Sequence, residues 1–147
     1  MSQKLTFQLD VTGSGMRTDS TNGKHTISID EPESLGGKDT AADPMSTLLA
    51  ALAGCENVMA QIIAKEMNIE IEDISFKVEG ELDPSGLMGN LEIKPYFEKV
   101  KVQAFLKTSA SEEEVDELRK KVDQRCPIYR TIKDAGIPIE NSWMKTK

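Results

Sequence analysis

The chain has 147 residues, of which 38% are hydrophobic and 29% charged, so it is long enough to bury the core of one globular domain. Eighteen basic residues against twenty-five acidic ones give a net charge of −7. No run of Lys and Arg forms a basic stripe, which argues against binding to nucleic acids or to anionic membranes.

The chain begins with a segment that lacks the apolar region and the cleavage site of a signal peptide. The apolar stretch around Leu48 to Ala53 is too short to span a bilayer. We therefore expect a cytoplasmic protein with no membrane partner, in which a stable structural disulfide would be unusual. With two cysteines and one histidine, the chain cannot complete a four-ligand Cys-type zinc site, and we expect no metal or cofactor.

The first thirty residues predict a three-stranded antiparallel meander. Every second residue between Leu5 and Val11 is apolar, which is typical of a half-buried strand. A glycine-rich turn follows at 13–15, and Asn22-Gly23 predicts a hairpin before a further alternating segment at 25–29.

A long helix is expected to begin at Asp43-Pro44, with Asp as the N-cap and Pro in the first turn, and to run to about Met67. The first half of this helix is apolar almost all round, which indicates a buried central helix. Gly54 within it suggests that another group approaches the backbone closely there.

The second half of the chain predicts two more strands and two helices before a final strand. Alternating apolar residues mark strands at 74–82 and 100–106, and Ser111 with Glu114 forms a capping box at the start of an amphipathic helix. A short helix is expected from Cys126-Pro127 to near Gly136, and the last strand from 137 to 144. These elements predict a single α+β domain over residues 1–147.

The two cysteines have different surroundings in the sequence. Cys55 lies in the middle of the apolar helix, where it is either a packed core thiol or a reactive thiol that receives a cation from elsewhere in the fold. Cys126 lies at a helix N-terminus with Arg125 and Arg130 nearby, so we expect Cys126 to be the more acidic thiol. Because 71 positions separate the cysteines, the sequence alone does not bring them together.

Three segments carry a resemblance to a known family. The sequence DPMSTLLAALAGC (Asp43 to Cys55), the later CPIYRTI (Cys126 to Ile132) and the preceding IDEPESLGG (Ile29 to Gly37) together resemble the OsmC/Ohr family of thiol-dependent peroxidases. The resemblance implies an OsmC-like fold, in which antiparallel sheets wrap around a long buried helix. It also implies an intertwined homodimer with active sites at its interface.

The same resemblance implies an activity and a role for each cysteine. Cys55 would be the peroxidatic residue that attacks an organic hydroperoxide, and Cys126 the resolving residue that closes a disulfide with it. A dithiol reductant of the dihydrolipoyl type would restore both thiols. The protein would then act in defence against oxidative stress.

The family also uses an arginine to hold the thiolate and a glutamate after the helix-starting proline to orient that arginine. Arg17 matches the arginine loosely, but Met45-Ser46 stands where many members have the glutamate. Glu56 lies about 100° round the helix from Cys55 and is a poor direct replacement. Either another acid substitutes, or the chain is a weak or inactive OsmC-like dimer that binds a small apolar ligand or senses redox state.

Overall fold

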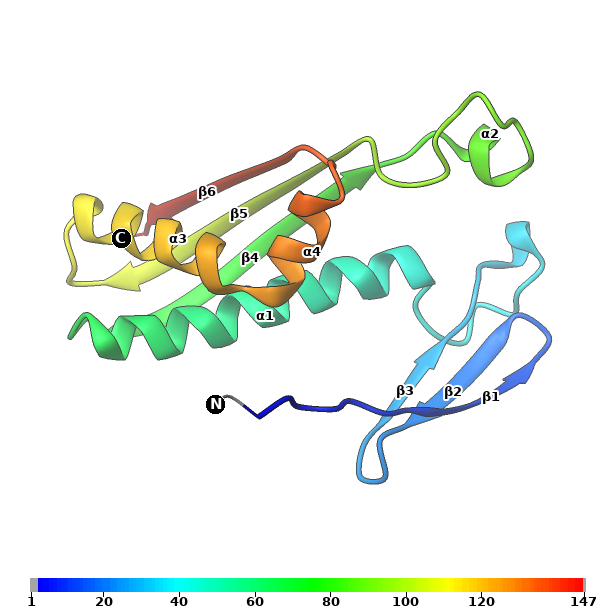
Figure 1. Ribbon diagram of the computed structural model, residues 1–147, viewed down its shortest axis with the longest axis horizontal. Helices are drawn as coiled ribbons and strands as arrows, with labels where there is room; N and C mark the ends of the chain where they lie inside the picture. Colours follow the sequence, from blue (N-terminus) through cyan, green and yellow to red (C-terminus); the bar gives the residue numbers. More distant parts are fainter. Residues whose placement is uncertain (1–2, 147) are drawn as a thin grey trace. The chain divides into compact units, whose positions relative to one another are not determined.

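The structure is a computed structural model that describes residues 3–146 and contains both helices and strands (Figure 1). Its contacts divide the chain into two compact units, one ending at Leu48 and the other beginning at Leu49. The first unit contains β1 (Asp10–Ser14), β2 (Arg17–Thr21), β3 (Thr26–Ile29) and the 3-10 helix η1 (Glu33–Leu35). Helix α1 (Pro44–Glu66) is followed by β4 (Ile71–Glu81), α2 (Pro84–Leu87), β5 (Lys99–Thr108), α3 (Glu112–Arg125), α4 (Pro127–Asp134) and β6 (Ile139–Lys145). The predicted α+β class is confirmed.

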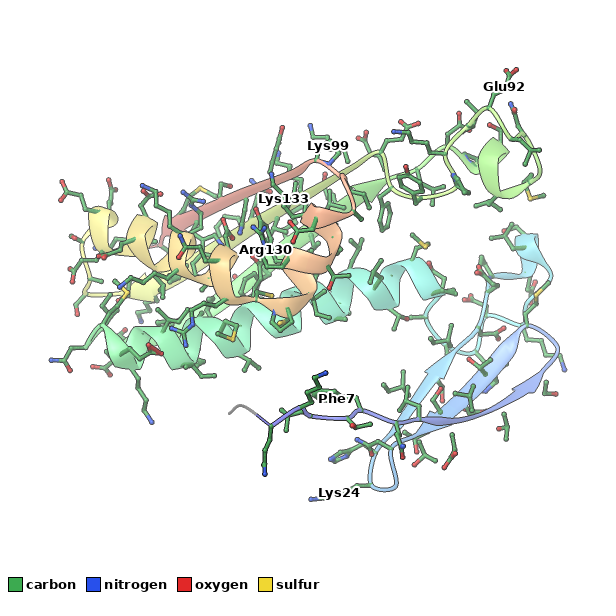
Figure 2. The ribbon with its side chains drawn as sticks, viewed as in Figure 1. Phe7, Lys24, Glu92, Lys99, Arg130 and Lys133 are labelled. Carbon is green, nitrogen blue, oxygen red and sulfur yellow. The ribbon has the colours of Figure 1, made fainter. Side chains whose placement is uncertain are left out.

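Strands β1, β2 and β3 form the predicted antiparallel meander. The turn between β1 and β2 contains Gly15 at φ 60°, a conformation that favours glycine. The first strand begins at Asp10, not at Leu5 as the alternation suggested, because residues 3–9 pair with no strand in the described chain. Leu5 and Phe7 on this segment are 81% and 88% exposed. Figure 2 labels the Phe7 side chain.

The loop between β3 and α1 is organised by one buried carboxylate. Asp30 accepts hydrogen bonds from the backbone N–H groups of Glu31, Lys38 and Thr40, and from the Thr40 hydroxyl at 2.7 Å. These bonds lower the pKa of Asp30 to about 2, with those from Thr40 the largest cause. A Cβ at Gly37 would lie 1.9 Å from the Glu31 carbonyl oxygen, so the loop requires glycine there.

Helix α1 begins and ends where the sequence predicts, with the Asp43 carboxylate accepting a hydrogen bond from the Ser46 N–H at 3.0 Å. The buried face of α1 is narrower than the sequence analysis expected. It covers a single stripe: Leu52, Glu56, Ala60, Ile63 and Ala64. Val58 and Ile62 remain 55% and 45% exposed, and no described atom lies within 4 Å of a Cβ built on Gly54. The close approach predicted at Gly54 is therefore wrong within this chain.

By length and composition alone, α1 is also apolar enough to cross a membrane. The core helix of a soluble protein passes the same test, so this finding is weak. The helix carries a buried Glu56 in its middle.

The second sheet is mixed, although the sequence analysis expected antiparallel sheets. β4 and β5 are antiparallel, with Val78 opposite Val102, whereas β6 runs parallel to β5 with Asn141 opposite Val102. The parallel pairing follows from the connection between the two strands. Helices α3 and α4 return the chain to the end of the sheet at which β5 begins, as a parallel pair requires.

The core of the second unit lies between this sheet and α3. Alternate residues of β5 and the apolar stripe of α3 are both buried: Val100, Val102, Ala104 and Leu106 on the strand, and Val115, Leu118 and Val122 on the helix. The capping box of Ser111 and Glu114 is confirmed. In Figure 1, α3 and α4 lie along the sheet, and the hydrogen bonds of Arg125 and Cys126 bring their junction beside α1.

Candidate functional site

The fold brings the two cysteines together. The Cys126 thiol donates a hydrogen bond to the sulfur of Cys55, with 2.9 Å between the two Sγ atoms, and both are free thiols. Cys55 comes from α1 and is half-buried, whereas Cys126 is 0% exposed. The two sulfurs are thus in direct contact, at a separation well above the disulfide bond length of about 2.05 Å.

Cys126 is positioned by the junction of two helices. Its N–H donates to the Val122 carbonyl oxygen at 2.8 Å and so ends α3. Its sulfur accepts a hydrogen bond from the Tyr129 N–H at 3.4 Å and so caps α4, where Pro127 fills the first position. Because one residue serves both helices, the direction of its side chain is set by their backbones.

Cys126 is not the acidic thiol that the sequence analysis expected. Burial raises the pKa of Cys126 to about 12, its hydrogen bond to Cys55 adds to the rise, and the Tyr129 N–H opposes it. The two nearby arginines are engaged elsewhere: Arg125 binds Glu66 at 2.9 Å, and Arg130 binds Asp134 at 2.7 Å. Figure 2 shows Arg130 on α4. At neutral pH Cys126 is therefore a protonated thiol and a hydrogen-bond donor.

This arrangement distinguishes the two sulfurs chemically. A hydrogen bond from a thiol favours negative charge on the sulfur that accepts it. Cys55 is the acceptor and also the more accessible of the pair. The geometry therefore suits Cys55 to meet an oxidant and Cys126 to react with the product.

Glu56, the residue after Cys55, is fully buried. Its Oε1 accepts a hydrogen bond from Asn141 Nδ2 at 2.8 Å, and the same nitrogen donates to Asp123 Oδ1 at 2.5 Å. Burial raises the pKa of Glu56 to about 7, and the charge of Asp123 raises it further, against the opposing Asn141 bond. Burial also raises the pKa of Asp123.

The sequence analysis considered Glu56 only as a replacement for the missing glutamate. Its side chain enters the core, as the i, i+4 spacing with Leu52 and Ala60 could have indicated. Within residues 3–146, no three His, Cys, Asp or Glu side chains form a group that could hold a metal ion.

Arg17, in the first unit, has a carboxylate partner that the sequence analysis missed. Its guanidinium donates to both oxygens of Asp19, at 2.9 and 3.2 Å, and to the Thr40 hydroxyl at 2.7 Å. Asp19 is held in turn by the Ser28 hydroxyl at 2.6 Å. The period of two along β2 could have indicated this pair, because residues i and i+2 share a face of a strand.

The helix start itself provides no acid to Arg17. Met45 and Ser46 occupy the first turn of α1, and no acidic residue lies in it. Arg17 is therefore oriented by a residue of its own strand, Asp19, together with Thr40 from the loop that Asp30 organises.

The fold matches several solved structures over almost their whole length. An OsmC-like protein from Mycoplasma pneumoniae aligns with a TM-score of 0.85 at 18% identity, over 99% of this chain and 100% of that one. An organic hydroperoxide resistance protein OsmC from Legionella pneumophila aligns with a TM-score of 0.72 at 21% identity, over 99% and 100%. An organic hydroperoxide resistance protein from Elizabethkingia anophelis gives a TM-score of 0.73 at 21% identity, over 99% and 100%.

The sequence comparisons agree with the fold. No curated protein matches the chain. Residues 37–142, which include both cysteines, match the family described as OsmC-like protein. The chain belongs to the OsmC-like family.

Proposed function

We propose that this protein is a thiol-dependent peroxidase that reduces organic hydroperoxides and acts in defence against oxidative stress. The observation that carries the proposal is the contact between the Cys126 thiol and the Cys55 sulfur at 2.9 Å. Membership of the OsmC-like family supports it, since two structural neighbours are named organic hydroperoxide resistance proteins. Two free thiols suit the reducing cytoplasm, which is where we propose that the protein acts.

In the proposed cycle, the Cys55 thiolate attacks the terminal oxygen of the hydroperoxide. The O–O bond breaks, the alcohol leaves with one proton, and Cys55 becomes a sulfenic acid. The Cys126 sulfur then attacks the Cys55 sulfur, an S–S bond forms, and the hydroxyl leaves as water with the Cys126 proton. A dithiol of the dihydrolipoyl type reduces this disulfide and is itself oxidised to a disulfide.

Arg17 would supply positive charge to the Cys55 thiolate. Its charge persists at any physiological pH, and the hydrogen bond to Asp19 raises its pKa further. In this proposal Asp19 takes the place of the glutamate that the helix start lacks. The apolar neighbours of Cys55 on α1, Leu52 and Met59, favour an alkyl or aryl hydroperoxide over hydrogen peroxide.

We further propose that the protein acts as a homodimer. Apolar side chains remain uncovered in each unit of the single chain, such as Phe7 in the first unit, and Val58 and Ile62 in the second. Uncovered apolar surface of this kind marks an interaction site in soluble proteins. A second copy is the partner that the family resemblance implies.

The test is consumption of cumene hydroperoxide with dihydrolipoamide as the reductant. We expect catalytic turnover by the unsubstituted chain and none by Cys55→Ser. Ser75→Ala, at an exposed position of β4, is the control for a small hydroxyl change elsewhere. Mass spectrometry after one equivalent of hydroperoxide should show the loss of two hydrogens, mapped to Cys55 and Cys126. A disulfide without turnover would favour a redox sensor. The absence of both the disulfide and the turnover would favour a binding protein.

A further inference from the structure

Arg17 is held along two edges of its guanidinium group by residues of the first unit. Asp19 accepts hydrogen bonds from Nε at 3.2 Å and from Nη2 at 2.9 Å. The remaining nitrogen, Nη1, donates to the Thr40 hydroxyl at 2.7 Å and to the Thr40 carbonyl oxygen at 3.4 Å. Every nitrogen of the guanidinium therefore has a partner, and one of the two partners lies 23 positions away in the chain.

The Thr40 hydroxyl also contacts Asp30, the buried carboxylate that directly follows β3. Thr40 Oγ1 lies 2.7 Å from Asp30 Oδ2, and Asp30 is 1% exposed. Hydrogen bonds from Thr40, followed by that from the Glu31 N–H, lower the pKa of Asp30 to about 2, so the carboxylate is ionised at neutral pH. Arginine has only donors and a carboxylate only acceptors, so the hydroxyl hydrogen points to Asp30 and a lone pair points to Arg17.

The loop that carries Thr40 is closed by backbone hydrogen bonds that do not involve this hydroxyl. The N–H of Gly37 donates to the Pro32 carbonyl oxygen at 3.1 Å. The N–H of Asp39 donates to the Glu31 carbonyl oxygen at 3.0 Å. Asp39, directly before Thr40, has φ 55°, a left-handed conformation that is uncommon for residues other than glycine. Closing the loop therefore does not by itself explain why a hydroxyl bridges the carboxylate and the arginine.

We propose that Asp30 is a positioning residue for Arg17 and that it acts through the Thr40 hydroxyl. Asp30 sets the direction of the hydroxyl, and the hydroxyl holds Nη1 while Asp19 holds Nε and Nη2. The guanidinium is then fixed against rotation about its Cζ–Nε bond. In the proposed peroxidase cycle, on which the catalytic meaning of this inference rests, Asp30 is a second carboxylate that keeps the charge of Arg17 in one orientation.

The first experiment measures the arginine itself and needs no peroxide. Rotation about the Cζ–Nε bond exchanges Nη1 with Nη2 of Arg17, and ¹⁵N exchange spectroscopy gives the rate. Thr40→Val removes the hydroxyl and keeps the branched shape of the side chain, whereas Thr40→Ser keeps the hydroxyl. Thr47→Val is the matched control, because the Thr47 hydroxyl makes a hydrogen bond of the same length, 2.7 Å, to the Asp43 carbonyl oxygen and not to the arginine.

We expect Thr40→Val to raise the rotation rate of Arg17 by roughly fivefold, because the guanidinium loses one hydrogen bond. Thr40→Ser and Thr47→Val should leave the rate near that of the unsubstituted chain. Equal rates in Thr40→Val and Thr40→Ser would overturn the proposal.

Asp30→Asn tests whether the carboxylate acts through the hydroxyl. We expect this substitution to raise the rotation rate in the chain that retains Thr40, and to add nothing in the Thr40→Val background. The same increase in both backgrounds would overturn the proposal.

A further measurement on the unsubstituted chain does not depend on the folding of any variant. A hydroxyl proton held by a carboxylate exchanges slowly with water, so the Thr40 hydroxyl proton should give a resonance at low temperature. A proton that exchanges too fast to be observed would overturn the proposal.

Hydroperoxide turnover is the second readout. The kcat/KM for cumene hydroperoxide should fall by roughly fivefold in Thr40→Val and recover in Thr40→Ser. Faster rotation in Thr40→Val with an unchanged kcat/KM would overturn the positioning role. Absence of turnover in the unsubstituted chain would instead remove the proposed function and leave the rotation rates unaffected.

Discussion

The Cys126 thiol donates its hydrogen to the sulfur of Cys55 across 2.9 Å, although 71 residues separate the two positions in the chain. The donor lies in the core at the junction of α3 and α4, and the acceptor lies half-exposed on α1. A buried thiol with a pKa near 12 is a poor nucleophile at neutral pH but a good hydrogen-bond donor. Cys55 therefore has the sulfur suited to the first attack, and Cys126 has the thiol suited to the later reaction with the product.

Replacing Cys126 should separate the oxidation of Cys55 from the formation of the disulfide. In Cys126→Ser, we expect the first equivalent of cumene hydroperoxide to be consumed while steady-state turnover falls by roughly tenfold or more, because no thiol traps the sulfenic acid. Mass spectrometry should show Cys55 gaining one oxygen and then two or three. Unimpaired turnover in this variant would show that Cys126 does not resolve the intermediate.

Asp19→Asn tests whether the strand carboxylate orients Arg17. The substitution removes a bidentate ion pair between exposed groups, so the thermal midpoint should hardly change. We expect hydroperoxide turnover to fall by about tenfold, because the guanidinium loses the acid that fixes its plane. Asp134→Asn breaks the comparable pair with Arg130 and should leave turnover unchanged. Equal effects of the two substitutions would contradict a special role for Asp19.

The raised pKa of Glu56 predicts a pH-dependent stability. The folded chain holds the Glu56 proton up to about pH 7, whereas an unfolded chain releases it near the ordinary value of 4.5. The folded state therefore binds more protons in this interval, and stability falls as the pH rises from about 4.5 to 7. The expected loss is roughly 3 kcal/mol, and it persists above pH 7.

Urea unfolding of the chain and of Glu56→Gln at pH 4.5, 6 and 8 measures this effect at one fixed protein concentration. As the pH rises, the unfolding free energy of the unsubstituted chain should fall relative to that of Glu56→Gln by roughly 3 kcal/mol. A difference that is independent of pH would mean that Glu56 ionises in the folded chain at its ordinary value.

The uncovered face of α1 predicts self-association. We expect the chain to sediment as a dimer and Val58→Glu to shift it to the monomer, because a charge would have to be buried without a partner. Lys120→Glu, on the exposed side of α3, serves as the control and should leave the dimer intact. A monomeric unsubstituted chain at micromolar concentration would contradict the prediction.

Local signals in the sequence were sufficient for most elements. The N-cap at Asp43 and the capping box at Ser111 placed the starts of α1 and α3, since both depend on residues within one helical turn. The alternation from Leu5 misplaced the first strand, because a strand exists only where another strand pairs with it. The parallel pairing of β6 with β5 was also missed, because the direction of a strand depends on the path of the whole connection before it.

The sequence by itself determined the class of the fold, the family resemblance and the two cysteines as candidates, because motifs and periodicity are properties of neighbouring residues. Only the tertiary structure decided which thiol holds the proton. The sequence pointed to an acidic Cys126 from its helix N-terminus and two arginines, but burial outweighs the helix, and both arginines bind carboxylates. Long-range pairing also revealed Thr40 beside Arg17 and Asn141 beside Glu56, since an electrostatic environment is set by residues that the fold, and not the chain order, makes neighbours.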